Sequence, residues 1–245
     1  MASSSTLPLD LIYANMNTLL NTIDYINNSF EYPTLTKIHS YPTFVSLTKL
    51  KKQLKTNAKS VSSDLGGGAN GHWGLVLTPT EYALVIQTPY VFPDKPGYFD
   101  LPRNTASDEA MILRDMYYEE LQTFWEAVEV WKALVKQIVA AVDKEFLEEF
   151  RDEMTNDITK SVVEILTYLF KNFANVGSVD VQREEEKVKA YFWNISDPPM
   201  AFITFIEDLQ LVATAAGLPW TEQMLINYDL DIIQKTTNFE AGLME

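Results

Sequence analysis

Apolar residues recur at three- and four-residue steps along most of this chain, which is the pattern of amphipathic helices. The first such segment covers residues 7–28, with Thr6 as a possible cap and Pro8 in the first turn. A second helix is predicted to begin after Thr43 and to turn Phe44, Leu47, Leu50 and Leu54 inward. The stripe of the first helix consists of Leu9, Ile12, Met16, Leu19, Leu20, Ile23 and Ile26.

Residues 61–104 interrupt this helical pattern with glycine and proline. Residues 66–74 predict a flexible loop whose end is anchored by Trp73, and residues 75–77 predict a short extended run. Thr78 and Pro79 predict the start of a short helix over residues 80–86. The four prolines of residues 87–104 exclude a helix there, so an ordered surface loop is expected. Its predicted anchors are Tyr90, Phe92, Tyr98 and Phe99.

Long helices are predicted for the second half of the chain. The longest begins at Thr105 or Ser107 and runs to about Val142, and a later one opens at Thr155 or Asn156. The other predicted helices are a short one after Asp143 and then residues 181–193, 200–216 and 222–233. The sequence therefore predicts an all-α protein of about nine helices. The predicted parts are an N-terminal helix (1–30), a helical domain (31–178) with the insertion 61–104, and a second helical domain (179–245).

Charge is distributed unevenly around a net value of −15. Residues 1–103 hold eight Lys or Arg and seven Asp or Glu, whereas residues 104–245 hold eleven and twenty-seven. The acidic half is a poor nucleic-acid binder because it repels phosphates. Residues 32–63, in contrast, hold six lysines and no acid, which is compatible with a phosphate-contacting face or with an ordinary solvated helix surface. The candidate RNA-binding residues are Lys49, Lys51, Lys52, Lys55 and Lys59.

Catalytic chemistry has little support in the sequence. The chain has no cysteine, and its two histidines, His39 and His72, lie in loops without metal-ligand spacing. The carboxylates of residues 148–149, 152–153 and 184–186 are adjacent in sequence and point to different sides of a helix. We expect no catalytic residue, no metal and no cofactor. The aromatic helix around Phe124, Trp125 and Trp131 is compatible with core packing or with a ligand slot.

Location and membrane contact are also expectations from the sequence. No run of about 18 apolar residues is present, so no membrane-spanning helix is expected. The first six residues lack the basic and apolar regions of a secretory signal, which favours a cytoplasmic location.

Two stretches of the second half resemble the Gag polyproteins of copia-type LTR retrotransposons. The first comprises residues 139–147 (VAAVDKEFL) with residues 165–170 (ILTYLF), and the second comprises residues 202–209 (FITFIEDL) with residues 216–221 (AGLPWT). Residues 32–39 and 66–77 resemble a divergent, glycine-rich branch of that family found in protist and algal elements. The chain departs from the family at the central tryptophan, which is Glu164 or Leu166 here, and it lacks the cysteines of a zinc knuckle.

The resemblance implies a capsid protein, with two small helical domains whose copies assemble into a virus-like particle around retroelement RNA. It implies homo-oligomers and RNA as partners, and RNA contact would fall to the lysines of residues 49–59. A monomeric helical adaptor that binds a peptide or protein partner is the alternative. The residues expected at assembly interfaces are Leu9, Ile12, Met16, Leu19, Ile23, Phe202, Phe205 and Leu209.

Overall fold

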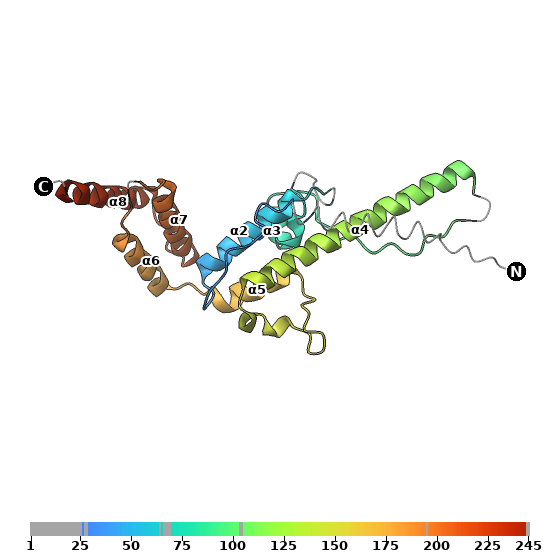
Figure 1. Cartoon of the computed structure of the whole chain (residues 1–245), viewed down its shortest axis with the longest axis horizontal. Helices are drawn as coiled ribbons and strands as arrows, with labels where there is room; N and C mark the ends of the chain where they lie inside the picture. Colours follow the sequence, from blue (N-terminus) through green and yellow to red (C-terminus); the bar gives the residue numbers. More distant parts are fainter. Residues whose placement is uncertain are drawn as a thin grey trace. The chain divides into compact units, whose positions relative to one another are not determined.

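The protein is all-α, as the sequence predicts (Figure 1). The computed structural model describes residues 26, 29–63, 65, 70–102, 105–194 and 196–243; for residues 201 and 237–243 it describes the backbone alone. The α-helices of this part are α2 (Phe44–Ser60), α3 (Pro79–Ala83), α4 (Ser107–Ala141), α5 (Val162–Phe173), α6 (Ser178–Ala190), α7 (Met200–Ala215) and α8 (Glu222–Leu243). Three 3-10 turns join them: Trp73–Leu75, Lys144–Phe146 and Glu148–Phe150. The expected helix over residues 7–28 lies outside the described residues except for Ile26, which is helical and buried.

The chain divides into two compact units. Unit 1 comprises Met1–Ser40 and Lys49–Tyr168, and unit 2 comprises Tyr41–Thr48 and Leu169–Glu245. The sequence suggested a boundary near residues 177–180, about ten residues later. The division falls within α5 because the end of this helix packs against residues 41–48. Phe44 meets Phe170 edge to face at 6.0 Å, and Tyr41 meets Phe173 at 5.4 Å.

A polar network holds residues 32–38 of unit 1 against α2 and α4. The fully buried Asn57 side chain accepts a hydrogen bond from the Tyr32 amide (2.8 Å) and donates to the Tyr32 carbonyl (2.8 Å) and to Gln137 Oε1 (2.8 Å). The Gln137 amide in turn donates to the Tyr32 carbonyl at 2.9 Å. Because buried amides must find partners, this arrangement sets the register of residues 32–38 along the end of α4. The Ile38 amide continues it by donating to the Ala141 carbonyl (2.8 Å).

Unit 2 encloses its own core among α6, α7 and α8. One cluster joins Val188, Phe202, Ile206, Leu209 and Ile232, and a smaller one joins Val181, Val212 and Ala213. Gly217 follows the C-cap of α7 and stops the helix, because its φ of +74° is readily available only to glycine. The Leu218 amide donates back to the Ala213 carbonyl (2.8 Å).

Three local expectations are corrected by the structure. Residues 75–77 are not extended, because the segment begins with a 3-10 turn and continues into the cap of α3. Helix α5 starts at Val162 and not at residue 155 or 156, because Ser161 and Glu164 form a capping pair there. Tyr98 does not anchor the loop of residues 87–102, since its side chain is fully exposed.

Candidate functional site

The lysines of α2 form a continuous cationic surface on unit 1. Helical geometry places Lys49, Lys52, Lys55 and Lys59, hereafter the lysine face, within about 120° of the helix circumference. Lys49, Lys52 and Lys59 are exposed, and α2 contains no acid. Lys51 points elsewhere and forms an ion pair with Glu81 of α3 (2.5 Å). The structure thus brings together four of the five predicted lysines.

The segment from Gly71 to Gly74 is fastened to the end of α2. The His72 amide donates to the Ala58 carbonyl (2.8 Å), and the Trp73 indole N–H donates to the Lys55 carbonyl (3.0 Å). Gly71 has φ +54°, and a Cβ there would lie 2.4 Å from the Val61 carbonyl oxygen, so only glycine fits. The ammonium groups of Lys55 and Lys59 lie over the Trp73 ring, 4.3 and 5.5 Å from its centroid, as in cation–π contacts. The expected anchoring role of Trp73 is therefore confirmed.

A buried histidine connects this segment with α4 and with the proline-rich loop. The His72 side chain is fully buried; its Nε2 lies 3.3 Å from Glu126 Oε1 and its Nδ1 lies 3.5 Å from the Tyr90 hydroxyl. Burial raises the pKa of Tyr90, and the nearby Tyr82 and Glu126 raise it further, so the hydroxyl keeps its proton. Tyr90 lies directly over Gly74, where a Cβ would be 1.9 Å from the ring atom Cγ.

Helix α3 forms one wall of a pocket in unit 1. The Glu81 amide donates to Thr78 Oγ1 (3.3 Å), while the Thr78 amide donates to Glu81 Oε2 (2.9 Å). This reciprocal cap holds a helix of only five residues, which would otherwise be too short to persist. It directs Tyr82 inward against Tyr90, with ring centres 5.9 Å apart.

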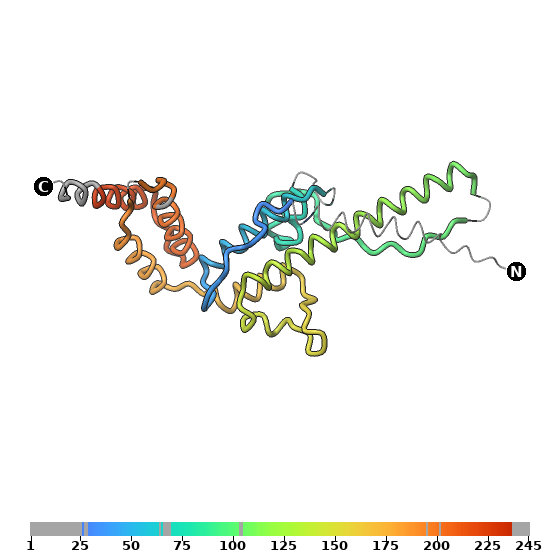
Figure 2. Tube along the Cα trace, in the orientation of Figure 1, coloured from blue at the N-terminus to red at the C-terminus, as the bar shows by residue number. Residues whose placement is uncertain are grey.

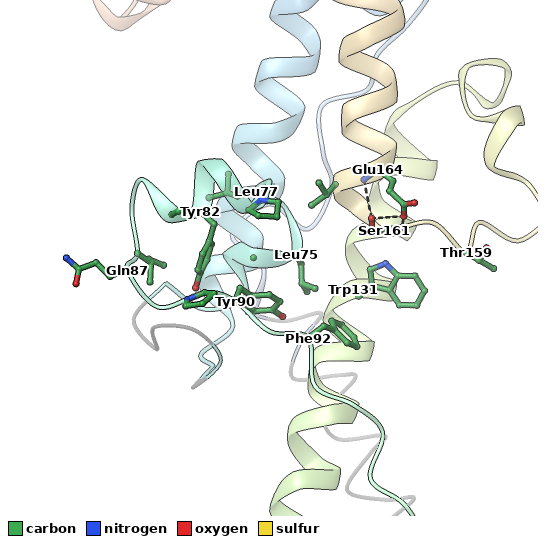
Figure 3. A pocket seen from close by; sticks show the side chains of 16 residues that line it. Leu75, Leu77, Tyr82, Gln87, Tyr90, Phe92, Trp131, Thr159, Ser161 and Glu164 are labelled. Carbon is green, nitrogen blue, oxygen red and sulfur yellow. Dashed lines mark hydrogen bonds between the residues drawn. The ribbon is translucent and has the colours of Figure 1, made fainter.

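These elements enclose a pocket of about 750 Å³ within unit 1 (Figure 3). Its volume lies in the range of small-molecule and peptide-side-chain pockets. Its lining comes from three distant parts of the chain: residues 74–92, Trp131 of α4 and residues 159–164 at the start of α5. Most of this lining is apolar, with Leu75, Leu77, Ile86, Phe92, Trp131 and Val163 among its members.

The polar groups at the pocket edge belong to the cap of α5. Ser161 Oγ and the Ser161 amide both donate to Glu164 Oε2 at 2.8 Å, as the dashed lines in Figure 3 show. The hydrogen bonds from the Ser161 amide and hydroxyl are the main cause that lowers the pKa of Glu164, with Lys160 adding to it. The pocket can therefore take an apolar group beside a fixed negative charge.

Residues suited to metal binding or acid–base catalysis do not gather here. Among the described residues, no three His, Cys, Asp or Glu side chains are placed to hold a metal ion. His39 is exposed, and His72 is enclosed as described above.

The expected interface residues of α7 are partly corrected. Phe202 and Leu209 are buried in the core of unit 2, so they are not available to a second copy. Phe205 is 39% exposed, and its ring lies 4.2 Å from that of Tyr191. The other expected interface positions, Leu9, Ile12, Met16, Leu19 and Ile23, lie outside the described residues.

An exposed apolar surface that the sequence pattern did not reveal lies on the first half of α4. Every buried residue of this 35-residue helix lies at or after Ala127. Residues 107–126, hereafter the α4 arm, carry Met111, Ile112 and Met116, which are 51%, 59% and 52% exposed. Residues 93–99 run back along this arm: Phe99 lies 5.3 Å from Tyr117, and Lys95 lies 5.8 Å from the Trp125 ring (Figure 2).

Comparison with known proteins gives no relative: no protein-family profile, no curated protein and no solved structure matches the chain. In the part of the chain that the structure describes, no helix combines the length and apolar character needed to cross a membrane.

Proposed function

We propose that this chain is a Gag-like structural protein that self-assembles into a capsid or virus-like particle enclosing retroelement RNA. The proposal joins the resemblance of residues 139–170 and 202–221 to Gag sequences with an all-α fold of two compact units. In it, the chain acts through surfaces that bind other copies, and no chemical step is required.

One observation carries the proposal: the α4 arm exposes apolar side chains outside the core of its own unit. Ile112 and Met116 are both more than half exposed, on a helix whose buried residues all lie in its second half. A helical arm of this kind is typical of a surface that a partner covers, since contiguous exposed apolar groups are unusual on monomers. Repeated self-contact would provide that cover.

The proposal is tested by size-exclusion chromatography with light scattering over a concentration series, followed by negative-stain imaging of the largest species. We expect concentration-dependent growth into shells, rings or sheets. A strict 27.9-kDa monomer at every concentration and at physiological salt would contradict the proposal.

The pocket beside Trp131 favours a second candidate, a helical adaptor that binds a peptide. An apolar peptide side chain followed by Lys or Arg would fit the apolar walls and the Glu164 carboxylate. A peptide-display screen on the full chain would test it. Binding lost on Tyr82→Ala and on Glu164→Gln, in a chain that stays monomeric, would favour the adaptor over the capsid.

A further inference from the structure

The α4 arm carries a row of negative charge next to its exposed apolar residues. The arm contains six acids and one base, Arg114. Asp108, Asp115 and Glu119 follow one another at steps of seven and four residues, so they lie within about 40° of one helix face. Ile112 lies between them on the same face, and all four side chains are exposed. We name Asp108, Ile112, Asp115 and Glu119 the acidic row.

The acidic row and the lysine face match in spacing when the two helices run antiparallel. Lys52 and Lys59 are seven residues apart, as are Asp108 and Asp115, which is about 10.5 Å of helix in each case. The next steps, from Lys52 to Lys49 and from Asp115 to Glu119, are about 4.5 and 6 Å. The flexible lysine side chain can absorb a difference of this size. The matched pairs are Lys59 with Asp108, Lys52 with Asp115, and Lys49 with Glu119.

We propose that the acidic row of one copy docks on the lysine face of the next copy. This inference rests on the proposed self-assembly and names the contact surfaces for it. The lysine stems would cover Ile112 while their ammonium groups meet the carboxylates. The two surfaces are different parts of the same unit, so the contact is head-to-tail, and its repetition gives a ring or an open array and not a closed dimer.

Charge complementarity favours pairing of the acidic row with the lysine face of a neighbouring copy over two alternatives, pairing of two α4 arms and binding of RNA. A second α4 arm is disfavoured because acids would face acids across the contact. RNA would be attracted to the lysine face, but it would leave the acidic row and Ile112 uncovered. A neighbouring copy covers both surfaces at once. The charged groups closest to the row, Arg114 (3.9 Å from Asp115) and Lys95 of the loop at residues 93–96, leave it strongly negative.

The experiment uses two charge-reversed full-length chains, freed of nucleic acid by nuclease and examined by sedimentation velocity at about 50 and 500 mM salt. The first variant carries Lys49→Glu and Lys52→Glu, and the second carries Asp115→Lys and Glu119→Lys. We expect each alone to need at least a tenfold higher concentration for half-assembly than the unaltered chain. High salt should weaken assembly of the unaltered chain in the same direction.

Mixing the two variants separates a docking defect from misfolding. The acidic row of the first variant matches the lysine face of the second, and the two reversed surfaces also match each other with opposite sign. Their mixture should therefore regain growth, with the two variants alternating, although neither variant assembles alone. A chain with all four reversals should regain assembly, since the pairs are restored with opposite sign. Matched controls are Lys136→Glu with Lys144→Glu, and Glu148→Lys with Glu153→Lys, which change charge by the same amount at other exposed positions.

Two outcomes would overturn the inference while leaving the capsid proposal standing. One is normal assembly of either reversed variant. The other is a combined result: only the lysine variant loses assembly, and the unaltered chain assembles only when RNA is added. That result would identify RNA as the occupant of the lysine face. If the unaltered chain does not assemble under any condition, the capsid proposal fails, and the inference fails with it.

Discussion

Single atoms decide whether the segment from Gly71 to Gly74 can hold its place between α2 and the proline-rich loop. Gly71 requires a positive φ, and Gly74 leaves the space that the Tyr90 ring occupies. Tyr90 in turn contacts Tyr82 and His72, so one ring reaches from the buried histidine to the pocket wall. The geometry of the pocket therefore depends on two residues that have no side chain.

Gly74→Ala should destabilise unit 1 because the new Cβ would lie 1.9 Å from Tyr90 Cγ. Overpacking of this kind costs about 1–3 kcal/mol in the free energy of unfolding. Urea unfolding followed by circular dichroism measures the change. Gly97→Ala is the matched control, since no atom lies within 4 Å of its Cβ position and a change under about 0.5 kcal/mol is expected. Equal stability of the two variants would contradict the assigned role of Tyr90.

Ser161→Ala should remove the cap of α5 and lower the free energy of unfolding by about 1 kcal/mol, the usual value for a helix N-cap. Urea titration of the variant and of the unaltered chain gives the difference. A cost near zero would mean that α5 is set by packing alone.

The same cap predicts a direction of pH dependence. The pKa of Glu164 is lowered in the folded chain, so the unfolded chain binds more protons and this contribution to stability rises with pH. It is present above about pH 4.5, the ordinary glutamate value, and is lost as the pH falls through the lower folded pKa. Glu164→Gln should therefore narrow the stability difference between pH 7 and pH 3.5. An unchanged difference would remove Glu164 from the explanation.

At the scale of elements, α4 divides into a buried half and an exposed arm. Its second half supplies Val130, Leu134 and Ile138 to the core, whereas the arm presents Ile112 and Met116 to solvent. Apolar periodicity continues without a break through both halves, although only the second half contributes buried residues. Periodicity alone cannot tell whether that surface packs within the chain or against another molecule.

Ile112→Gln combined with Met116→Gln should weaken self-assembly while changing the free energy of unfolding by less than about 0.5 kcal/mol. Light scattering reports the first quantity and urea unfolding the second. Leu134→Ala, in the buried half, should behave in the opposite way and cost about 2–5 kcal/mol of stability. If the glutamine variant loses stability as the alanine variant does, the arm belongs to the core.

Helix starts show how far the sequence could predict the elements. The starts of α2 and α3 were predictable because Thr43 and Thr78 are the nearest capping residues to their apolar stripes. The start of α5 was missed because Thr155 and Asn156 offered earlier caps. Asn156 instead adopts φ +61° in a turn held by Asp152, and the Ser161–Glu164 spacing was the signal that could have located the helix.

At the scale of the whole molecule, the helical class followed from periodicity, but the candidate surfaces did not. The lysine face was visible as a run of lysines without acids, since its members are close in sequence. The pocket was not visible because residues 74–92, Trp131 and residues 159–164 meet only through tertiary packing. The burial of Phe202 and Leu209 was likewise undetermined, because α7 is apolar on more than one side and either side could have formed the core.

Unit 2 is built from two stretches that are far apart in the sequence, and this affects how the chain folds during synthesis. Residues 41–48 leave the ribosome more than a hundred residues before Phe170, and later still come Val212 and Ala213, whose cluster includes Phe44 and Val45. The apolar surface of Phe44 stays exposed until these partners have been synthesised, because contacts between residues so distant in sequence form slowly and late. A nascent chain that carries unit 1 alone would therefore expose this segment to chaperones or to neighbouring nascent chains on the same messenger RNA.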